Sequence, residues 1–129
     1  MTPEMTMLAL SVVLGFVYIM TSAVAVTMQR GPSWNMGSRD DPMPPVNKVA
    51  GRLQRASHNF LETFPLFAAA VLMADATNRH SELTVWGAQL YFWGRVVYLP
   101  VYALGIPVVR TIIWGLATLG IAMLLLALV

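Results

Sequence analysis

The chain has 129 residues, of which 57% are hydrophobic and 11% are charged, and its formal net charge is +2. Soluble domains carry roughly 45–50% apolar and about 25% charged residues, so this composition excludes a water-soluble globular protein, and the apolar content also excludes intrinsic disorder. The absence of cysteine excludes a disulfide framework, a thiolate metal site and a protein thiol as nucleophile.

The first predicted element is a membrane-spanning helix over residues 5–29. The stretch Met7–Met28, between Glu4 and Arg30, holds no charged residue and reaches the roughly 20 residues that a helix needs to cross a bilayer. It is longer than the core of a signal peptide, and an acidic residue precedes it where a signal peptide has basic ones. We therefore expect this helix to be retained.

The second predicted helix, over residues 48–74, is less uniformly apolar. Its stretch Phe60–Ala74 is apolar apart from Glu62 and is too short to span a bilayer alone. The preceding stretch Asn47–Asn59 has no glycine–proline break, so it can extend the helix outward. Pro65 is expected to kink this helix without ending it, because neighbouring helices can satisfy the freed carbonyl.

Two further spans are predicted over residues 82–104 and 107–129. The apolar part of the first holds one charged residue, Arg95, and the segment Gly105-Ile106-Pro107 then predicts a turn with the proline in the first turn of the next helix. From Thr111 to the last residue the chain is uncharged. The pattern predicts an all-α integral membrane protein, a bundle of four transmembrane helices in a single domain.

The distribution of basic residues predicts the topology of these four spans. Only the first connection, Gly31–Val46, is sizeable. Basic residues flank the first loop (Arg30, Arg39, Lys48, Arg52 and Arg55) and the third (Arg110), against Arg79 alone in the second. The positive-inside rule therefore predicts cytoplasmic first and third loops and both termini on the opposite side. Scattered arginines without a basic block do not indicate a nucleic-acid partner.

Two stripes of polar residues run along the two middle helices. At about 100° per residue, the second helix places Arg52, Arg55, Asn59 and Glu62 within an arc of roughly 80°, with His58 beside it. On the third helix, Tyr91, Arg95, Tyr98 and Tyr102 fall within roughly 60°. Charged residues inside a span usually face a bundle interior or a water-filled cavity, so the stripes predict a shared polar surface.

Two interpretations of this surface are open. Guanidiniums bind carboxylates, Asn offers a donor and an acceptor, and Glu accepts from an ammonium, so the set suits a small zwitterionic peptide. Alternatively, Glu62 neutralises Arg55 and Arg95 inside the bundle, and the stripes only hold helices together.

Other polar residues do not indicate a site. His58 and His80 are far apart in the sequence and have few carboxylate neighbours, so no metal site is expected. Asp40 and Asp41 precede Pro42 and are typical of a turn.

Two segments carry a resemblance to a known family. Residues 52–65, RLQRASHNFLETFP, contain the pattern R-x-x-R-A-x-x-N-x-x-E followed by a proline, and residues 95–111 read RVVYLPVYALGIPVVRT. The first segment resembles the second helix of the MAPEG family, the membrane-associated proteins in eicosanoid and glutathione metabolism. The second segment resembles that family's third helix and the start of its fourth. The resemblance covers nearly the whole chain, and the overall pattern looks most like that of small bacterial members of the family.

The resemblance implies a homotrimer of four-helix protomers that holds glutathione between adjacent subunits near the cytoplasmic side, while a hydrophobic substrate arrives from the bilayer. Two residues would be catalytic, Arg110 beside the glutathione sulfur and Thr111 next to it. The residues that would bind glutathione are Arg30, Arg52, Arg55, Asn59 and Glu62, with Arg95, Tyr98 and Tyr102 from the neighbour. Thr63 and His58 depart from the family pattern, standing where particular branches have a tyrosine and an arginine.

The resemblance also implies a mechanism and a location. Only the thiolate of glutathione attacks, and the unperturbed pKa of a thiol is about 8.5; Arg110, at a helix start, would lower that pKa. The function implied is that of a glutathione-dependent transferase or peroxidase, acting on a lipophilic electrophile or a lipid hydroperoxide, in a bacterial inner membrane. The alternative is a non-catalytic trimeric membrane protein that binds lipid or a partner, with structural polar stripes.

Overall fold

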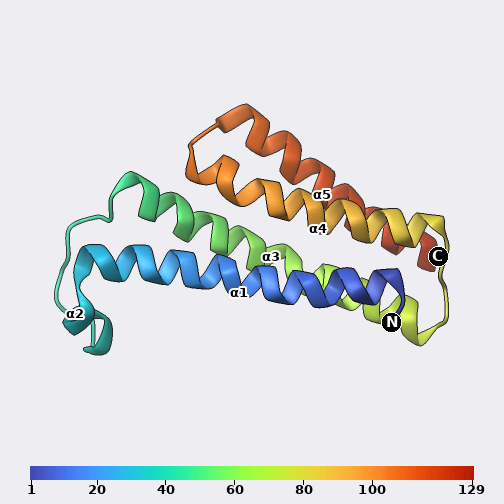
Figure 1. The fold of residues 1–129 in the computed structure, drawn as a ribbon, viewed down its shortest axis with the longest axis horizontal. Helices are drawn as coiled ribbons and strands as arrows, with labels where there is room; N and C mark the ends of the chain where they lie inside the picture. Colours follow the sequence, from blue (N-terminus) through green and yellow to red (C-terminus); the bar gives the residue numbers. More distant parts are fainter.

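The computed structural model describes residues 1–129 and is entirely helical. Its elements are α1 (Pro3–Arg30), α2 (Pro32–Met36), α3 (Lys48–Ala76), α4 (Glu82–Ala103) and α5 (Pro107–Leu128). The four long helices form one elongated bundle, and both termini lie at the end opposite α2 (Figure 1). The short α2 was not expected from the sequence; it begins at Pro32, directly after Gly31, and lies in the first loop.

Local sequence signals set the ends of the long helices. The side chain of Thr2 accepts a hydrogen bond from the Met5 amide at the start of α1, and Asn47 accepts one from Ala50 at the start of α3. Ser81 and Thr84 form a reciprocal capping box at the start of α4. Pro65 lies inside α3, which continues past it to Ala76.

Three of the helices, α1, α3 and α5, are long and apolar enough to cross a membrane. Their outer surfaces expose large apolar side chains, such as Phe16 on α1, Leu66 on α3 and Leu126 on α5. A water-soluble monomer rarely exposes so much apolar surface, whereas a surface that contacts lipid acyl chains is expected to be apolar. The protein is therefore an integral membrane protein. α4, which carries Glu82 and Arg95, is not among these three, so its membrane span stays a prediction.

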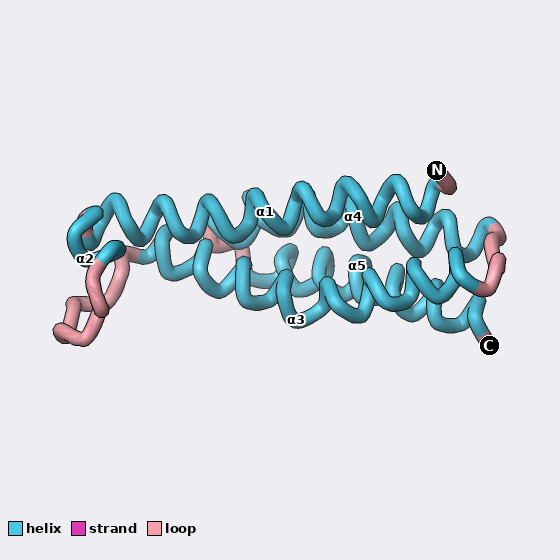
Figure 2. The backbone as a smooth tube through the Cα atoms, turned by 90° about the horizontal axis from the view of Figure 1, so that it is seen from below, coloured by secondary structure: helices cyan, strands magenta, loops and turns pink.

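α3 and α4 are the central helices of the bundle. Each packs against the other and against both α1 and α5, whereas α5 packs only against α3 and α4. The tube view shows the long helices running nearly parallel or antiparallel along one axis (Figure 2). α4 and α5 approach closely at Gly87 and Gly120, where a Cβ on either would lie 2.7 Å or 2.4 Å from the other's carbonyl oxygen. This position in the bundle brings the polar stripe of α4 against α3.

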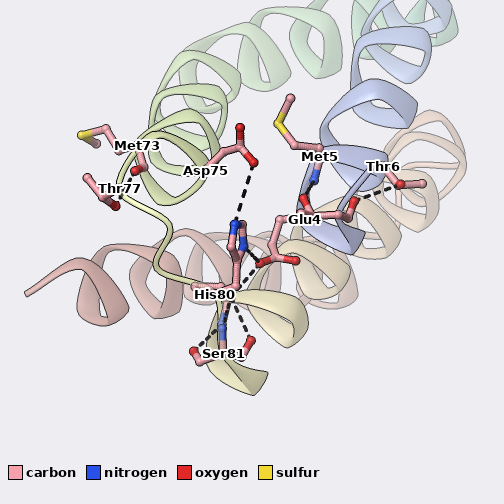
Figure 3. Close-up of polar contacts among 10 residues, drawn as sticks. Glu4, Met5, Thr6, Met73, Asp75, Thr77, His80 and Ser81 are labelled. Carbon is pink, nitrogen blue, oxygen red and sulfur yellow. Dashed lines mark hydrogen bonds and ion pairs between the residues drawn. The ribbon is translucent and has the colours of Figure 1, made fainter.

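A polar cluster ties three helices together at the end that holds both termini. Glu4 of α1 is 1% exposed, and its carboxylate contacts His80 Nδ1 and accepts a hydrogen bond of 2.9 Å from the Thr84 hydroxyl of α4. His80 Nε2 lies 3.8 Å from Asp75 Oδ1 of α3, so its ring lies between two carboxylates (Figure 3). We call these four residues the Glu4–His80 cluster. They do not form a metal-binding group.

Candidate functional site

The buried side chain of Arg95 on α4 is the innermost part of the candidate site. It is 0% exposed. Its Nη1 donates to Asn59 Oδ1 at 2.8 Å and its Nη2 to Thr63 Oγ1 at 2.7 Å, both on α3. The ring of Tyr98 covers the guanidinium, with 4.8 Å between the guanidinium carbon and the ring centroid. Oxygen acceptors and an aromatic face thus replace the water that this charge has lost.

No carboxylate pairs with Arg95. Both ion pairs in the structure involve His80, so Glu62 forms none, and its side chain is exposed on α3. The interpretation in which Glu62 neutralises Arg55 and Arg95 inside the bundle therefore does not describe this protomer. The two stripes meet through the neutral side chains of Asn59 and Thr63 instead.

A second group of contacts surrounds Tyr102, closer to the α4–α5 turn. Arg55 Nε of α3 donates to the Tyr102 hydroxyl at 3.1 Å. The guanidinium carbon of Arg110, in the first turn of α5, lies 4.8 Å from the centroid of the Tyr102 ring, and Tyr98 packs edge-on against that ring at 5.5 Å between centroids. We call Arg55, Tyr98, Tyr102 and Arg110 the arginine–tyrosine cluster. One tyrosine thereby holds two cations near each other without an acidic partner.

Arg52 binds the turn between α4 and α5. Its Nη1 donates to the Ala103 carbonyl at 3.3 Å. The turn residue Gly105 has a φ of 75°, which favours glycine, and a Cβ there would lie 2.6 Å from the Arg52 guanidinium carbon, so the arginine packs directly against this residue. Part of the hydrogen-bonding capacity of Arg52 is therefore used to hold the turn.

An open hollow of about 450 Å³ lies beside these arginines, at the start of α3. Its lining includes Lys48, Arg52, Arg55 and His58 and contains no acidic residue. We call it the basic hollow. Several cations without a counter-charge, with Arg55 exposed among them, form a surface that attracts carboxylates and phosphates.

The structure brings most of the expected site residues to one end of the bundle. They are Arg52, Arg55, Asn59, Arg95, Tyr98, Tyr102 and Arg110. Three others form no hydrogen bond or ion pair with this group in the protomer. Glu62 is exposed, the Thr111 hydroxyl donates to the Pro107 carbonyl at 3.3 Å, and Arg30 donates to the Pro44 carbonyl at 3.1 Å and lies over the ring of Trp34.

Thr63 is a member of this network that the sequence analysis did not assign to the site. Its hydroxyl donates to the Phe60 carbonyl at 3.3 Å, so in its 3.1 Å contact with Tyr91 the tyrosine is the donor. Thr63 thus accepts from both Tyr91 and Arg95. Its place four residues after Asn59 was the available signal, because residues at that spacing share a helix face.

Comparison with known proteins gives one match. The family model described as the MAPEG family matches residues 7–129. No curated protein and no solved structure matches the chain.

Proposed function

The chain belongs to the MAPEG family, and from that premise we propose that it is a glutathione-dependent membrane transferase or peroxidase. Its second substrate would be a lipophilic electrophile or a lipid hydroperoxide that reaches the site from the bilayer. We propose further that the protein is a homotrimer in a bacterial inner membrane, with the first and third loops cytoplasmic and glutathione held where adjacent protomers meet.

This proposal is supported by the combination of the basic hollow with polar groups farther along α3 that have hydrogen-bonding capacity to spare. Glutathione carries two carboxylates and one ammonium. Arg52 and Arg55 line the hollow and match the carboxylates, while Glu62, exposed on the same helix and free of any ion pair, matches the ammonium. Arg95 donates to the oxygen of the Asn59 amide, so the N–H groups of that amide remain free to donate to the ligand. The residues present therefore fit the tripeptide.

The proposed role of the arginine–tyrosine cluster is to favour the ionised thiol. Glutathione supplies the sulfur nucleophile. Arg110 lies in the first turn of α5, where its charge and the positive end of the helix dipole both favour an anion and lower the thiol pKa from its ordinary value of about 8.5. Thr111 and Arg30 would add donors in the assembled trimer, and Tyr102 holds Arg110 in place.

The non-catalytic alternative also has an observation in its favour. Arg95 with Asn59 and Thr63, and Arg52 with the Ala103 carbonyl, hold α3 and α4 together within the protomer. If the polar stripes serve only to hold the helices together, the protein is a non-catalytic trimeric membrane protein that binds lipid or a partner.

Glutathione binding separates the two functions. We expect wild-type protein in detergent to give a calorimetric binding signal, and Arg55→Ala and Glu62→Ala each to raise the Kd by roughly tenfold or more, the loss of one charge-assisted hydrogen bond. Arg79→Ala is the matched control, because it removes a basic side chain from the loop before α4, at the other end of the bundle. Wild-type protein that binds no glutathione would instead support the non-catalytic alternative.

A further inference from the structure

The contact between Arg95 and Asn59 fixes which way the Asn59 amide faces. Arginine has only hydrogen-bond donors, so the atom of Asn59 that accepts from Nη1 at 2.8 Å is the oxygen Oδ1. The amide nitrogen Nδ2 must then point the other way. It makes no hydrogen bond within the protomer and is not enclosed, since Asn59 is half-buried.

Arg95 itself is closed off from any ligand. Its side chain is 0% exposed, and Nη1 and Nη2 are taken by Asn59 and Thr63. Its Nε is buried without a partner, and the Tyr98 ring lies over the guanidinium. Asn59 is half-buried, so a ligand bound along this face of α3 can reach its amide but not the enclosed guanidinium of Arg95.

Thr63 strengthens this arrangement and is likewise unavailable to a ligand. Its hydroxyl already donates to the Phe60 carbonyl and accepts from Arg95 and from Tyr91. Both partners of the Arg95 guanidinium are therefore on α3, one turn apart, and only Asn59 has hydrogen-bonding capacity left over.

We propose that Arg95 is a positioning residue that makes Asn59 a donor-only contact for the ligand. This inference rests on the proposed function and specifies one part of the site. From the sequence alone, Asn59 offers both a donor and an acceptor, and the family resemblance implies that Arg95 contacts glutathione directly. In this geometry Asn59 presents only N–H groups, which select a carboxylate or carbonyl oxygen of glutathione, and Arg95 acts through it.

The physical advantage of this arrangement lies in the direction and strength of the amide donor. An unrestrained amide can turn its oxygen toward the ligand, where it repels a carboxylate. The guanidinium removes that orientation, and its charge polarises the amide so that the N–H groups become stronger donors.

A double-mutant cycle on glutathione affinity tests the inference. The variants are Arg95→Met, Asn59→Ala and both together, each purified in detergent, with glutathione Kd measured by calorimetry and folding followed by thermal melting. We expect each single substitution to raise the Kd by roughly tenfold, and the double variant to bind no more weakly than Asn59→Ala alone, because Arg95 acts through Asn59. Arg95→Lys keeps the charge but cannot reach both partners, so its effect should be intermediate.

Asn59→Asp adds a readout that a purely structural role would not move. It keeps an oxygen for Arg95 and removes both N–H donors, so the melting temperature should equal or exceed that of wild type while glutathione binding weakens at least as much as in Asn59→Ala.

Additive losses in the cycle would show that Arg95 touches the ligand itself and would overturn the inference. So would a lower melting temperature of the Arg95 variants with an unchanged Kd. If Arg95→Met does not fold, Arg95→Lys in the same cycle decides between these outcomes. Wild-type protein without glutathione binding would overturn the proposed function and this inference together, whereas wild-type binding with additive losses overturns the inference alone.

Discussion

The Glu4–His80 cluster and the arginine–tyrosine cluster lie at opposite ends of the same bundle and treat charge differently. At one end, a buried carboxylate and an imidazole face each other, and a second carboxylate stands 3.8 Å beyond the ring. At the other, Arg55 and Arg110 contact one tyrosine ring, and the basic hollow contains no acidic residue.

This difference separates a structural role from a binding role. Polar groups that pair with each other inside the protomer leave little for a ligand, and removing one member of such a buried pair destabilises the helix packing. Cations without counter-charges cost stability through mutual repulsion, and such a cost is typical of functional sites. The comparison predicts that substitutions at one end change stability and that substitutions at the other change ligand affinity and rate.

The largest effect is expected for Arg110→Ala in the arginine–tyrosine cluster. Without this cation the glutathione thiol ionises less readily, so the conjugation rate at neutral pH should fall by roughly 100-fold. Because Arg110 is proposed to lower the thiol pKa, its loss should move the rising limb of the pH–rate profile to higher pH. The measurement is the rate of conjugation to a chloronitrobenzene against pH, with Arg110→Lys as the charge-retaining control. An unchanged profile would remove Arg110 from its assigned role.

A smaller effect, of a different kind, is expected for His80→Ala. The substitution leaves the buried Glu4 carboxylate without its imidazole partner, which should lower the free energy of unfolding by about 1–3 kcal/mol. Thermal melting in detergent measures the loss. The glutathione Kd should stay at its wild-type value. A parallel loss of glutathione affinity would show that the Glu4–His80 cluster is not purely structural.

The smallest effect is expected for Gly105→Ala, next to Arg52. A positive φ costs a residue with a Cβ about 1–2 kcal/mol, and here the new Cβ also displaces the Arg52 guanidinium from the turn. We expect a small drop in melting temperature together with a severalfold weaker glutathione Kd. Gly31→Ala is the matched control, because Gly31 also has a positive φ but open space around it. Equal Kd values for the two variants would show that the position of Arg52 does not matter for binding.

The sequence predicted the parts of this molecule that depend on local pattern. The uncharged stretch Met7–Met28 lies within α1, and the glycine–proline turn lies between α4 and α5, because chain composition and proline chemistry act locally. Helical periodicity also placed Asn59 and Arg95 on facing stripes, which the structure joins directly.

Contacts between distant segments could not be predicted in this way. Glu4 and His80 are 76 positions apart, and no periodicity relates them. The close approach of α4 and α5 needs Gly87 and Gly120 to face each other, which depends on the rotation of two separate helices. The saturation of Arg95 by neutral oxygens, with Glu62 left free, likewise follows from the packing of α3 against α4 and not from the stripe on either helix.

The most direct measurement is an experimental density map of the protein in lipid nanodiscs with glutathione at saturating concentration. We expect glutathione to lie against Arg55 and Glu62, with an oxygen atom facing Asn59 Nδ2, and no ligand at the Glu4–His80 cluster. Glutathione bound elsewhere, or a basic hollow that stays empty at saturation, would contradict the claim that the unpaired polar groups beside the arginine–tyrosine cluster bind glutathione.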